Sequence, residues 1–418
     1  MISFSDNISF KKHMETLELT NLEEKKTSSK WLAFGLCVVS YMLSGTVSTL
    51  MSVYLPVAIP ELKGQAVSQA ELGEIGAYVN AIFLYGWMVG GLLFGVVSDR
   101  IGRVKSLTLV IGLYGVSTCL VTIVPDWYSL LALRFFAGMG IGGVLLITTV
   151  YISEIWQDKN KAVMLGILAV FFPVGIVTTG SLNLIFSDWR SAFAVGFIPV
   201  IIAVLVFFLL PESDKWRVTK THTTKPEGLF VESNRANLIS GSLIFGSVLI
   251  GLWGIFSWLP TWVQTLLATG QDGQKERGLV MILLGMGGIT GGIFSGILIN
   301  KFGKKATLMA TFGTCLVMCC ILFLTNSTFS SIIYIETAAL AFCFGISQGA
   351  LSSYIPELFP VSIRGTATGF CFNVGRFFTA TAVFFIGSLV AVLGGFGNAL
   401  LVFTIPFLVA LIVTARSK

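Results

Sequence analysis

The sequence predicts an all-α membrane protein with twelve transmembrane helices, arranged as two pseudo-symmetric six-helix bundles. Three observations support this fold class: an apolar composition, twelve long apolar stretches, and a repeat that relates the two halves of the chain. Hydrophobic residues make up 55% of the 418 residues, and charged residues only 11%. Because about a quarter of the residues in a soluble domain are charged, this chain has too few charges to cover a water-facing surface. We therefore expect its excess apolar surface to face lipid.

Twelve apolar stretches follow one another along the chain. A helix needs about 20 mostly apolar residues to cross a bilayer, and each stretch meets this requirement. Short polar turns separate most of them. In order, the expected spans are residues 31–58, 72–97, 106–124, 128–151, 162–185, 191–210, 239–262, 278–299, 306–326, 330–352, 366–392 and 396–414.

The longest polar interruption, 211–238, lies in the middle of the chain and is rich in Lys, Glu, Thr and Ser. We interpret it as a cytosolic linker between an N-terminal bundle, 31–210, and a C-terminal bundle, 239–414. Residues 1–30 are polar and lack the apolar core of a signal peptide, so we expect a cytosolic tail. The last four residues, 415–418, are the expected cytosolic C-terminus.

Lysine and arginine are distributed unevenly among the polar segments. With both termini in the cytosol, the inner segments hold 21 of the 27 cations and the outer segments hold four. Cytosolic loops of membrane proteins carry such an excess of positive charge. We therefore expect a multi-pass protein of the cytoplasmic (inner) membrane, of bacterial type, with both termini cytosolic. The net charge of +6 then reflects membrane orientation and indicates no nucleic-acid partner.

Three pairs of matching segments relate the two halves, at corresponding helix boundaries and with offsets of 201, 203 and 207 residues. Internal repeats of this kind are typical of transporters, whose binding site lies between the repeats near the membrane midplane. The pairs are Gly95-Val-Val-Ser-Asp99-Arg100-Ile-Gly102-Arg103 with Gly296-Ile-Leu-Ile-Asn300-Lys301-Phe-Gly303-Lys304, Tyr151-Ile-Ser-Glu154 with Tyr354-Ile-Pro-Glu357, and Ile198-Pro199 with Ile405-Pro406.

The first of these loops resembles the signature loop of the major facilitator superfamily, and the resemblance covers residues 31–414. The second copy has Asn300 in place of the acid. The resemblance implies a latch that holds one conformation and releases in the other. The residues that we assign to this latch are Gly95, Asp99, Arg100, Gly102, Arg103, Glu154, Gly296, Asn300, Lys301, Gly303, Lys304, Glu357 and Arg364.

Other motifs are similar to those of particular branches of the superfamily. Arg134-x-x-x-Gly138-x-Gly140-x-Gly142 resembles the fourth-helix motif of proton-coupled members, and Pro211-Glu212-Ser213 is similar to a motif of the sugar porters. Pro356-Glu357-Leu-Phe-Pro360 is similar to a segment shared by sugar porters and organic-acid (metabolite):proton symporters. These resemblances imply proton symport of a sugar or of an organic acid.

Only two cations, Arg134 and Arg376, lie inside the expected spans. Arg376 follows the cytosolic Arg364 by twelve residues, which places it near mid-bilayer at about 1.5 Å per residue. A central arginine costs about 3 kcal/mol on insertion scales, so a functional role is the default hypothesis. We expect Arg376, aided by Asn373 on the same helix face, to bind an anionic group of the solute. A structural tie to helix carbonyls or to a loop acid is the alternative.

Further polar and aromatic residues are candidates for lining the solute site. They are Tyr41, Tyr78, Asn80, Trp253, Trp258 and Gln348.

No aspartate or glutamate lies deep in any expected span, and the stretch Tyr41–Ser48 lacks the acid that related symporters carry in their first helix. A proton carrier must titrate, so three routes stay open. Glu74 pairs with Arg134 and carries the proton, or the protein is a uniporter or exchanger, or an anionic solute brings its own proton.

We therefore expect a secondary active or facilitative transporter that moves a small organic solute, preferably an organic anion (carboxylate), by alternating access. A sugar or polyol porter is the first alternative, followed by a drug exporter and a non-transporting membrane sensor. An enzyme is not expected, because the sequence shows no nucleophile–base pair and no nucleotide loop.

The expected partners are the small solute, protons and the lipid bilayer, without nucleic acid, and we expect a monomer. No cofactor and no metal are expected. All seven cysteines fall in apolar segments, where they act as small hydrophobic side chains.

Overall fold

The computed structural model describes residues 4–156, 160–219, 230–268, 270–360 and 363–417, and every regular element in these ranges is a helix. Residues 220–229 of the expected linker, and residues 1–3 and 418 of the expected terminal segments, lie outside the described residues.

The helices cover most of the chain. Their bounds are α1 Phe4–Lys63, α2 Gln69–Ile101, α3 Arg103–Leu120, η1 Val121–Ile123, α4 Trp127–Ile155, α5 Asn160–Ile185, α6 Trp189–Phe193, η2 Ala194–Gly196, α7 Phe197–Leu209, α8 Asp214–Thr219, α9 Glu232–Phe256, α10 Leu259–Thr265, α11 Gln274–Phe302, α12 Lys304–Thr325, α13 Ile332–Glu357, α14 Arg364–Phe384, α15 Ile386–Leu393, α16 Phe396–Val402 and α17 Ile405–Arg416.

Within the described residues, twelve helical spans are long and apolar enough to cross a membrane, which confirms the predicted fold class. Several spans consist of two helical pieces. The seventh breaks between α9 and α10, where Pro260 stands in the first turn of α10. The last breaks between α16 and α17, with Pro406 in the same position. Proline lacks an amide hydrogen and is therefore tolerated where a helix begins.

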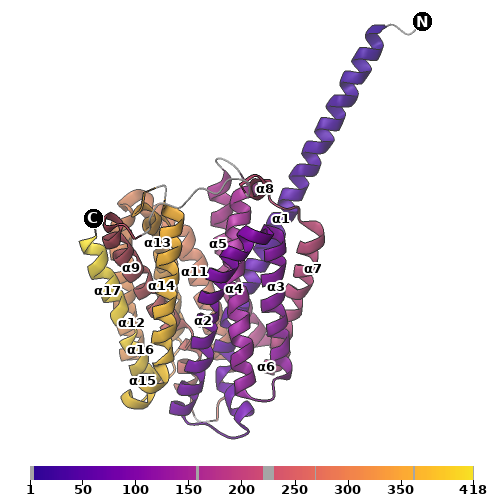
Figure 1. Ribbon diagram of the computed structural model, residues 1–418. Helices are drawn as coiled ribbons and strands as arrows, with labels where there is room; N and C mark the ends of the chain where they lie inside the picture. The colour runs from indigo at the N-terminus through magenta and orange to yellow at the C-terminus, as the bar shows by residue number, and fades with distance from the viewer. Residues whose placement is uncertain (1–3, 157–159, 220–229, 269, 361–362, 418) are drawn as a thin grey trace.

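The helices pack as two sets with matching contacts (Figure 1). In the first set α2 packs on α4, α1 on α5, and α3 on α7. In the second set the equivalent helices make equivalent contacts: α11 packs on α13, α9 on α14, and α12 on α17. The two sets meet along two seams, one between α5 and α11 and the other between α2 and the pair α14 and α15.

Glycines allow α2 and α4 to approach until their backbones touch. A Cβ atom added at Gly86, Gly90, Gly138 or Gly142 would lie only 2.0 to 2.1 Å from a carbonyl oxygen of the facing helix. Small residues at such crossings let membrane helices gain van der Waals contact over their full length. The glycines of the fourth-helix motif are therefore packing residues.

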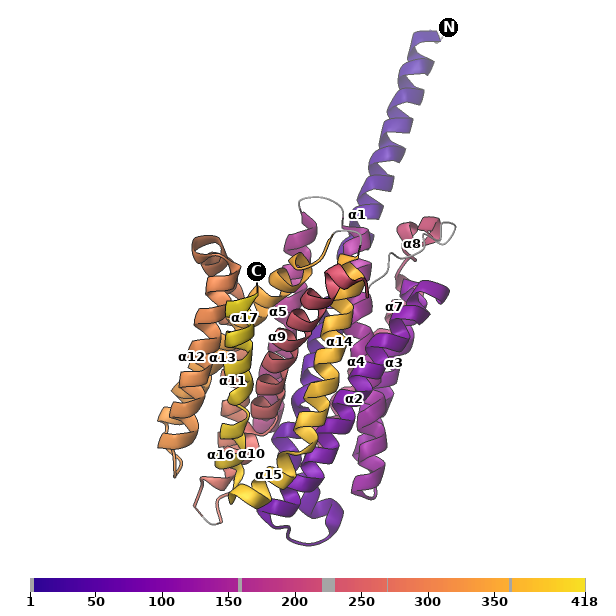
Figure 2. The same ribbon diagram turned by 60° about the vertical axis from the view of Figure 1, so that its left-hand side comes forward.

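Both chain ends lie at the same end of the bundle, which we call the chain-end side (Figure 1). The N-terminal part of α1 projects beyond the bundle on this side. The short helix α8 also lies there, whereas α15 and α16 lie at the opposite end, which we call the far side (Figure 2).

Candidate functional site

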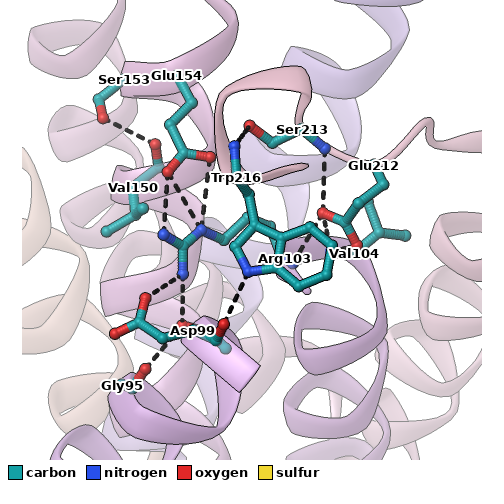
Figure 3. A network of polar contacts seen from close by, with 11 residues as sticks. Gly95, Asp99, Arg103, Val104, Val150, Ser153, Glu154, Glu212, Ser213 and Trp216 are labelled. Carbon is teal, nitrogen blue, oxygen red and sulfur yellow. Dashed lines mark hydrogen bonds and ion pairs between the residues drawn. The ribbon is translucent and has the colours of Figure 1, made fainter. Parts of the chain in front are cut away.

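Arg103, the first residue of α3, joins the ends of three helices at the chain-end side (Figure 3). Its guanidinium forms ion pairs of 2.6 Å with Asp99 at the end of α2 and of 3.1 Å with Glu154 at the end of α4. Both Arg103 and Glu154 are largely buried, whereas Asp99 is exposed. Since water screens exposed pairs, the pair with Glu154 is the stronger tie.

The other residues of the first latch copy take different positions. Arg100 is exposed. Gly95 lies one turn before Asp99, where α2 passes Leu146 of α4, and a Cβ atom there would be 3.1 Å from that side chain.

Glu212 completes this network, although the sequence analysis did not assign it to the latch (Figure 3). Gly102 precedes α3 with a φ of 109°, a backbone conformation that favours glycine, and it has no side chain to cap the helix. The Glu212 carboxylate accepts hydrogen bonds from the amides of Arg103, at 2.8 Å, and Val104, at 3.2 Å. A carboxylate at a helix N-terminus also opposes the helix dipole. The sequence does contain one signal for this role: Gly102 precedes α3 and has no side chain, so another residue must accept from the first amides of the helix.

Replacing Glu212 with alanine is expected to lower the melting temperature of the purified protein, because the start of α3 loses the carboxylate that caps it. Loss of a helix cap costs about 0.5–2 kcal/mol. The matched control is Glu232→Ala, which removes an exposed acid from the first turn of α9. Equal melting temperatures for the two variants would contradict the capping role.

The second copy of the loop is sparser. Gly303 precedes α12 with a φ of 81°, but the space beside it is open, whereas the space beside Gly102 holds Glu212. Lys304 forms an ion pair with Glu357, which matches the pair of Arg103 with Glu154 in the first copy.

The remaining residues of the second copy make weaker contacts. Asn300 and Gly296 are exposed, and the ammonium of Lys301 lies 5.2 Å from the centroid of the Phe302 ring. Arg364 donates a hydrogen bond of 3.4 Å to the Phe359 carbonyl.

Arg376 of α14 lies at the seam with α2. Its guanidinium carbon is 5.6 Å from the centroid of the Trp87 ring. Among the described residues, the guanidinium takes part in no hydrogen bond and no ion pair. In the described ranges, no helix carbonyl and no loop acid binds this cation.

Four aromatic rings from both helix sets gather beside Arg376, and we call them the aromatic cluster. Trp87 lies 5.4 Å from Trp253 of α9 and 6.0 Å from Phe172 of α5, measured between ring centroids. Tyr41 of α1 lies 6.3 Å from Phe172. Tyr41 and Trp253 were predicted from the sequence, whereas the two central rings, Trp87 and Phe172, were not. Neither of these two carries a signal that distinguishes it from a packing aromatic.

Three candidate amides, Asn373, Gln348 and Asn80, have a buried atom without a partner in the described part of the chain. Asn373 donates to the Gly369 carbonyl at 2.9 Å, while its own buried carbonyl oxygen has no partner in the described part of the chain and faces Gly91 of α2. The buried amide nitrogen of Gln348 on α13 is likewise without a partner there.

Three other candidates lie away from the aromatic cluster, toward the far side. Trp258 is fully buried and stacks on Phe396. Its ring also packs against Gly76, where an added Cβ atom would collide with it. Tyr78 donates a hydrogen bond of 2.7 Å to Glu74. Asn80 is buried two residues further along α2.

The structure does not bring Glu74 and Arg134 together, so this expected pair is not formed. Glu74 is exposed and accepts from Tyr78. Arg134 is only 1% exposed and donates to the carbonyls of Val47, at 3.0 Å, and Ser48, at 3.4 Å. It also stands 4.0 Å from the Phe83 ring centroid. Backbone carbonyls of α1 thus bind Arg134, although an acidic side chain was the partner expected from the sequence.

Two matching sets of membrane-crossing helices, with a polar network at one end and a cation in the seam between them, define a multi-pass membrane transporter. The family model of the Major Facilitator Superfamily matches residues 37–383, and the chain belongs to this family. The resemblance noted in the sequence is thereby confirmed.

Individual proteins of the family are similar over most of the chain. The "Cis,cis-muconate transport protein" of Acinetobacter baylyi is 29% identical, over 88% of this chain and 90% of its own. The "Sialic acid transporter NanX" of Escherichia coli is 28% identical, over 78% and 80%. The inward-open structure of the xylose transporter XylE from E. coli has a TM-score of 0.76 at 16% identity, covering 93% of this chain and 96% of that one. This last likeness concerns the fold.

Proposed function

We propose that this protein carries a small organic carboxylate across the membrane and that Arg376 binds the carboxylate group. The observation that carries this proposal is a guanidinium in the seam between the helix sets, without an ion pair among the described residues. Arg376 is half-buried. A charge that is partly withdrawn from water is costly unless it is paired, and an arriving carboxylate supplies the pair through two parallel hydrogen bonds. The relatives named for muconate and for sialic acid support an anionic solute.

The aromatic cluster is the proposed contact surface for the rest of the solute. Trp87, Trp253, Phe172 and Tyr41 offer flat, largely apolar faces beside the anion-binding group. Asn373 and Gln348 are proposed to bind polar substituents with their unpaired amide atoms. Tyr78, Asn80 and Trp258 lie toward the far side, so we propose that they shape the path of the solute there.

The proposed setting is a bacterial inner membrane, with the chain-end side and both termini in the cytosol. The excess of lysine and arginine in the segments on that side supports this orientation. We propose that 31–210 and 239–414 act as the two moving bundles, joined by the linker 211–238, and that both latch copies act at their cytosolic ends. We also propose that the protein acts as a monomer and without nucleic acid.

For proton coupling, we propose a route that needs no pair of Glu74 with Arg134. Glu74 accepts a hydrogen bond from Tyr78, and the two terminal nitrogens of Arg134 donate to carbonyls of α1. A carboxylate solute that arrives with its own proton fits these contacts, and so does exchange of one anion for another.

A thermal-shift screen of the purified protein tests the proposed solute class. The probes are benzoate, cis,cis-muconate, N-acetylneuraminate and xylose. A ligand that binds only the folded state at a hundred times its Kd stabilises it by about 2.7 kcal/mol. We expect at least one carboxylate to raise the melting temperature and xylose to leave it unchanged. Stabilisation by xylose alone would contradict the proposal and favour a sugar porter.

A further inference from the structure

Arg134 is a buried cation without a counter-charge. Its two terminal nitrogens donate to the carbonyls of Val47 and Ser48, while its buried Nε has no partner in the described part of the chain. No carboxylate of the described residues forms an ion pair with it. Hydrogen bonds to neutral carbonyls leave the net positive charge in place, and a buried net charge is costly unless it is compensated.

The helices around Arg134 supply no acid at its depth. α1, α2 and α4 pack against one another in the first helix set (Figure 1). Residues 31–60 of α1 and 127–153 of α4 contain no aspartate and no glutamate. The acids of α2 stand within its first two turns and its last turn. A compensating charge beside the guanidinium therefore has no source in these three helices.

Two other buried donors of the same helices also lack partners. They are the Ser52 hydroxyl on α1 and the Asn80 amide nitrogen on α2, and neither atom has a hydrogen-bond partner among the described residues. Both side chains are at most 4% exposed, so bulk water does not reach them.

Arg134 lies where α1 and α2 converge. One of its nitrogens donates to the Ser48 carbonyl of α1, and its guanidinium carbon stands 4.0 Å from the centroid of the Phe83 ring of α2. Toward the far side the same two helices touch again, because a Cβ atom at Gly76 of α2 would lie 2.5 Å from the Leu55 side chain of α1. These two contacts bracket a short stretch of the interface.

Ser52 and Asn80 belong to that bracketed stretch. Ser52 lies four residues after Ser48 along α1, and Asn80 lies four residues after Gly76 along α2. Residues four apart share one face of a helix, so both donors stand on the faces that make the two contacts. They therefore lie about one helical turn from the guanidinium of Arg134.

We propose that a small inorganic anion, chloride under physiological conditions, binds between α1, α2 and α4, held by Nε of Arg134, the Ser52 hydroxyl and the Asn80 amide. Unpaired donors around one positive charge require an acceptor, and an anion supplies both the acceptor and the counter-charge. A water molecule would accept hydrogen bonds but leave the charge uncompensated. Donors enclosed so deeply do not admit an organic solute, so this site is separate from the one proposed at Arg376.

Thermal melting of the purified protein in sodium chloride and in sodium gluconate, at constant ionic strength, tests the proposal. A ligand at a hundred times its Kd shifts the folding equilibrium by about a hundredfold, so the melting temperature should rise with chloride and then level off. Bromide should replace chloride. Arg134→Gln should lose this shift, whereas Arg376→Gln should keep it.

A built-in acid gives a second test. Ser52→Asp places a carboxylate at the proposed anion position, so its melting temperature should no longer depend on chloride. Ser52→Asn is the matched control, because it has nearly the same size without the charge. In gluconate it should melt below Ser52→Asp. Equal melting temperatures of these two variants in gluconate would contradict the proposal.

Anomalous diffraction from crystals grown in bromide locates the anion, and we expect a peak beside the Arg134 guanidinium. No peak there, or an equal chloride shift in the parent and in Arg134→Gln, would overturn the proposal. If Arg134→Gln does not fold, the two Ser52 variants and the bromide peak decide the question. No organic solute is present in these experiments, so their failure is distinct from a failure of the carboxylate proposal.

Discussion

Replacing Arg376 with glutamine is expected to abolish carboxylate transport while the fold is retained. The substitution removes the cation that the described structure leaves without an ion pair. A charge-assisted hydrogen bond contributes about 1.5–3 kcal/mol, so the affinity should fall by about tenfold or more. Uptake of the carboxylate that stabilises the parent, measured in proteoliposomes, gives the readout. Arg376→Lys should retain partial activity, because it keeps the charge but loses the planar fork.

The control for this variant is Phe378→Leu, two residues along α14, whose side chain is 53% exposed and faces away from the packed interior. Both variants should melt close to the parent temperature. Transport by Arg376→Gln at the parent rate would show that the guanidinium does not hold the solute. Unfolding of Arg376→Gln alone would show that it is a structural residue.

Gly142→Leu is expected to cause the largest loss of stability of the substitutions considered, together with a loss of transport. A Cβ atom at this position would lie 2.1 Å from the Trp87 carbonyl oxygen, so α2 and α4 must move apart. Overpacking costs about 1–3 kcal/mol, and a rigid backbone neighbour places this case at the upper end. Displacing Trp87 also disturbs the ring beside Arg376.

Thermal melting and uptake together test this second expectation. The same substitution at Gly313, where a Cβ atom has nothing within 4 Å, should leave both quantities close to those of the parent. A melting temperature of Gly142→Leu equal to that of Gly313→Leu would mean that α2 and α4 are not held at backbone contact.

The long apolar stretches were sufficient to predict the twelve spans, and the repeats drew attention to Arg103 and Glu154, although their ion pair was not predicted. These features depend on composition and on residues that stand near helix ends. Glu212 escaped the prediction because it is 109 residues from the amide that it caps. Such a contact depends on where the sixth span ends in space, which no local pattern records.

The partners of Arg134 and Arg376 were equally hidden, for different physical reasons. The partners of Arg134 are backbone carbonyls, which every residue possesses and which therefore leave no trace in the sequence. Trp87 is one of many aromatic residues in the spans, and only the crossing of α2 and α14 places it beside Arg376. Helix patterns thus predicted the elements, while the pairing of distant side chains required the structure.

The guanidinium of Arg376, which has no ion pair among the described residues, also has an electrical consequence. On the proposed function, an empty site carries one positive charge in the seam, whereas a site that holds a monocarboxylate without its proton is neutral. Moving one elementary charge through a potential of 100 mV changes the free energy by about 2.3 kcal/mol. A potential that is negative inside the cell would therefore draw the empty site toward the cytosol and leave the loaded site unaffected. Voltage would then act on the unloaded half of the transport cycle and set how fast the carrier returns for its next solute.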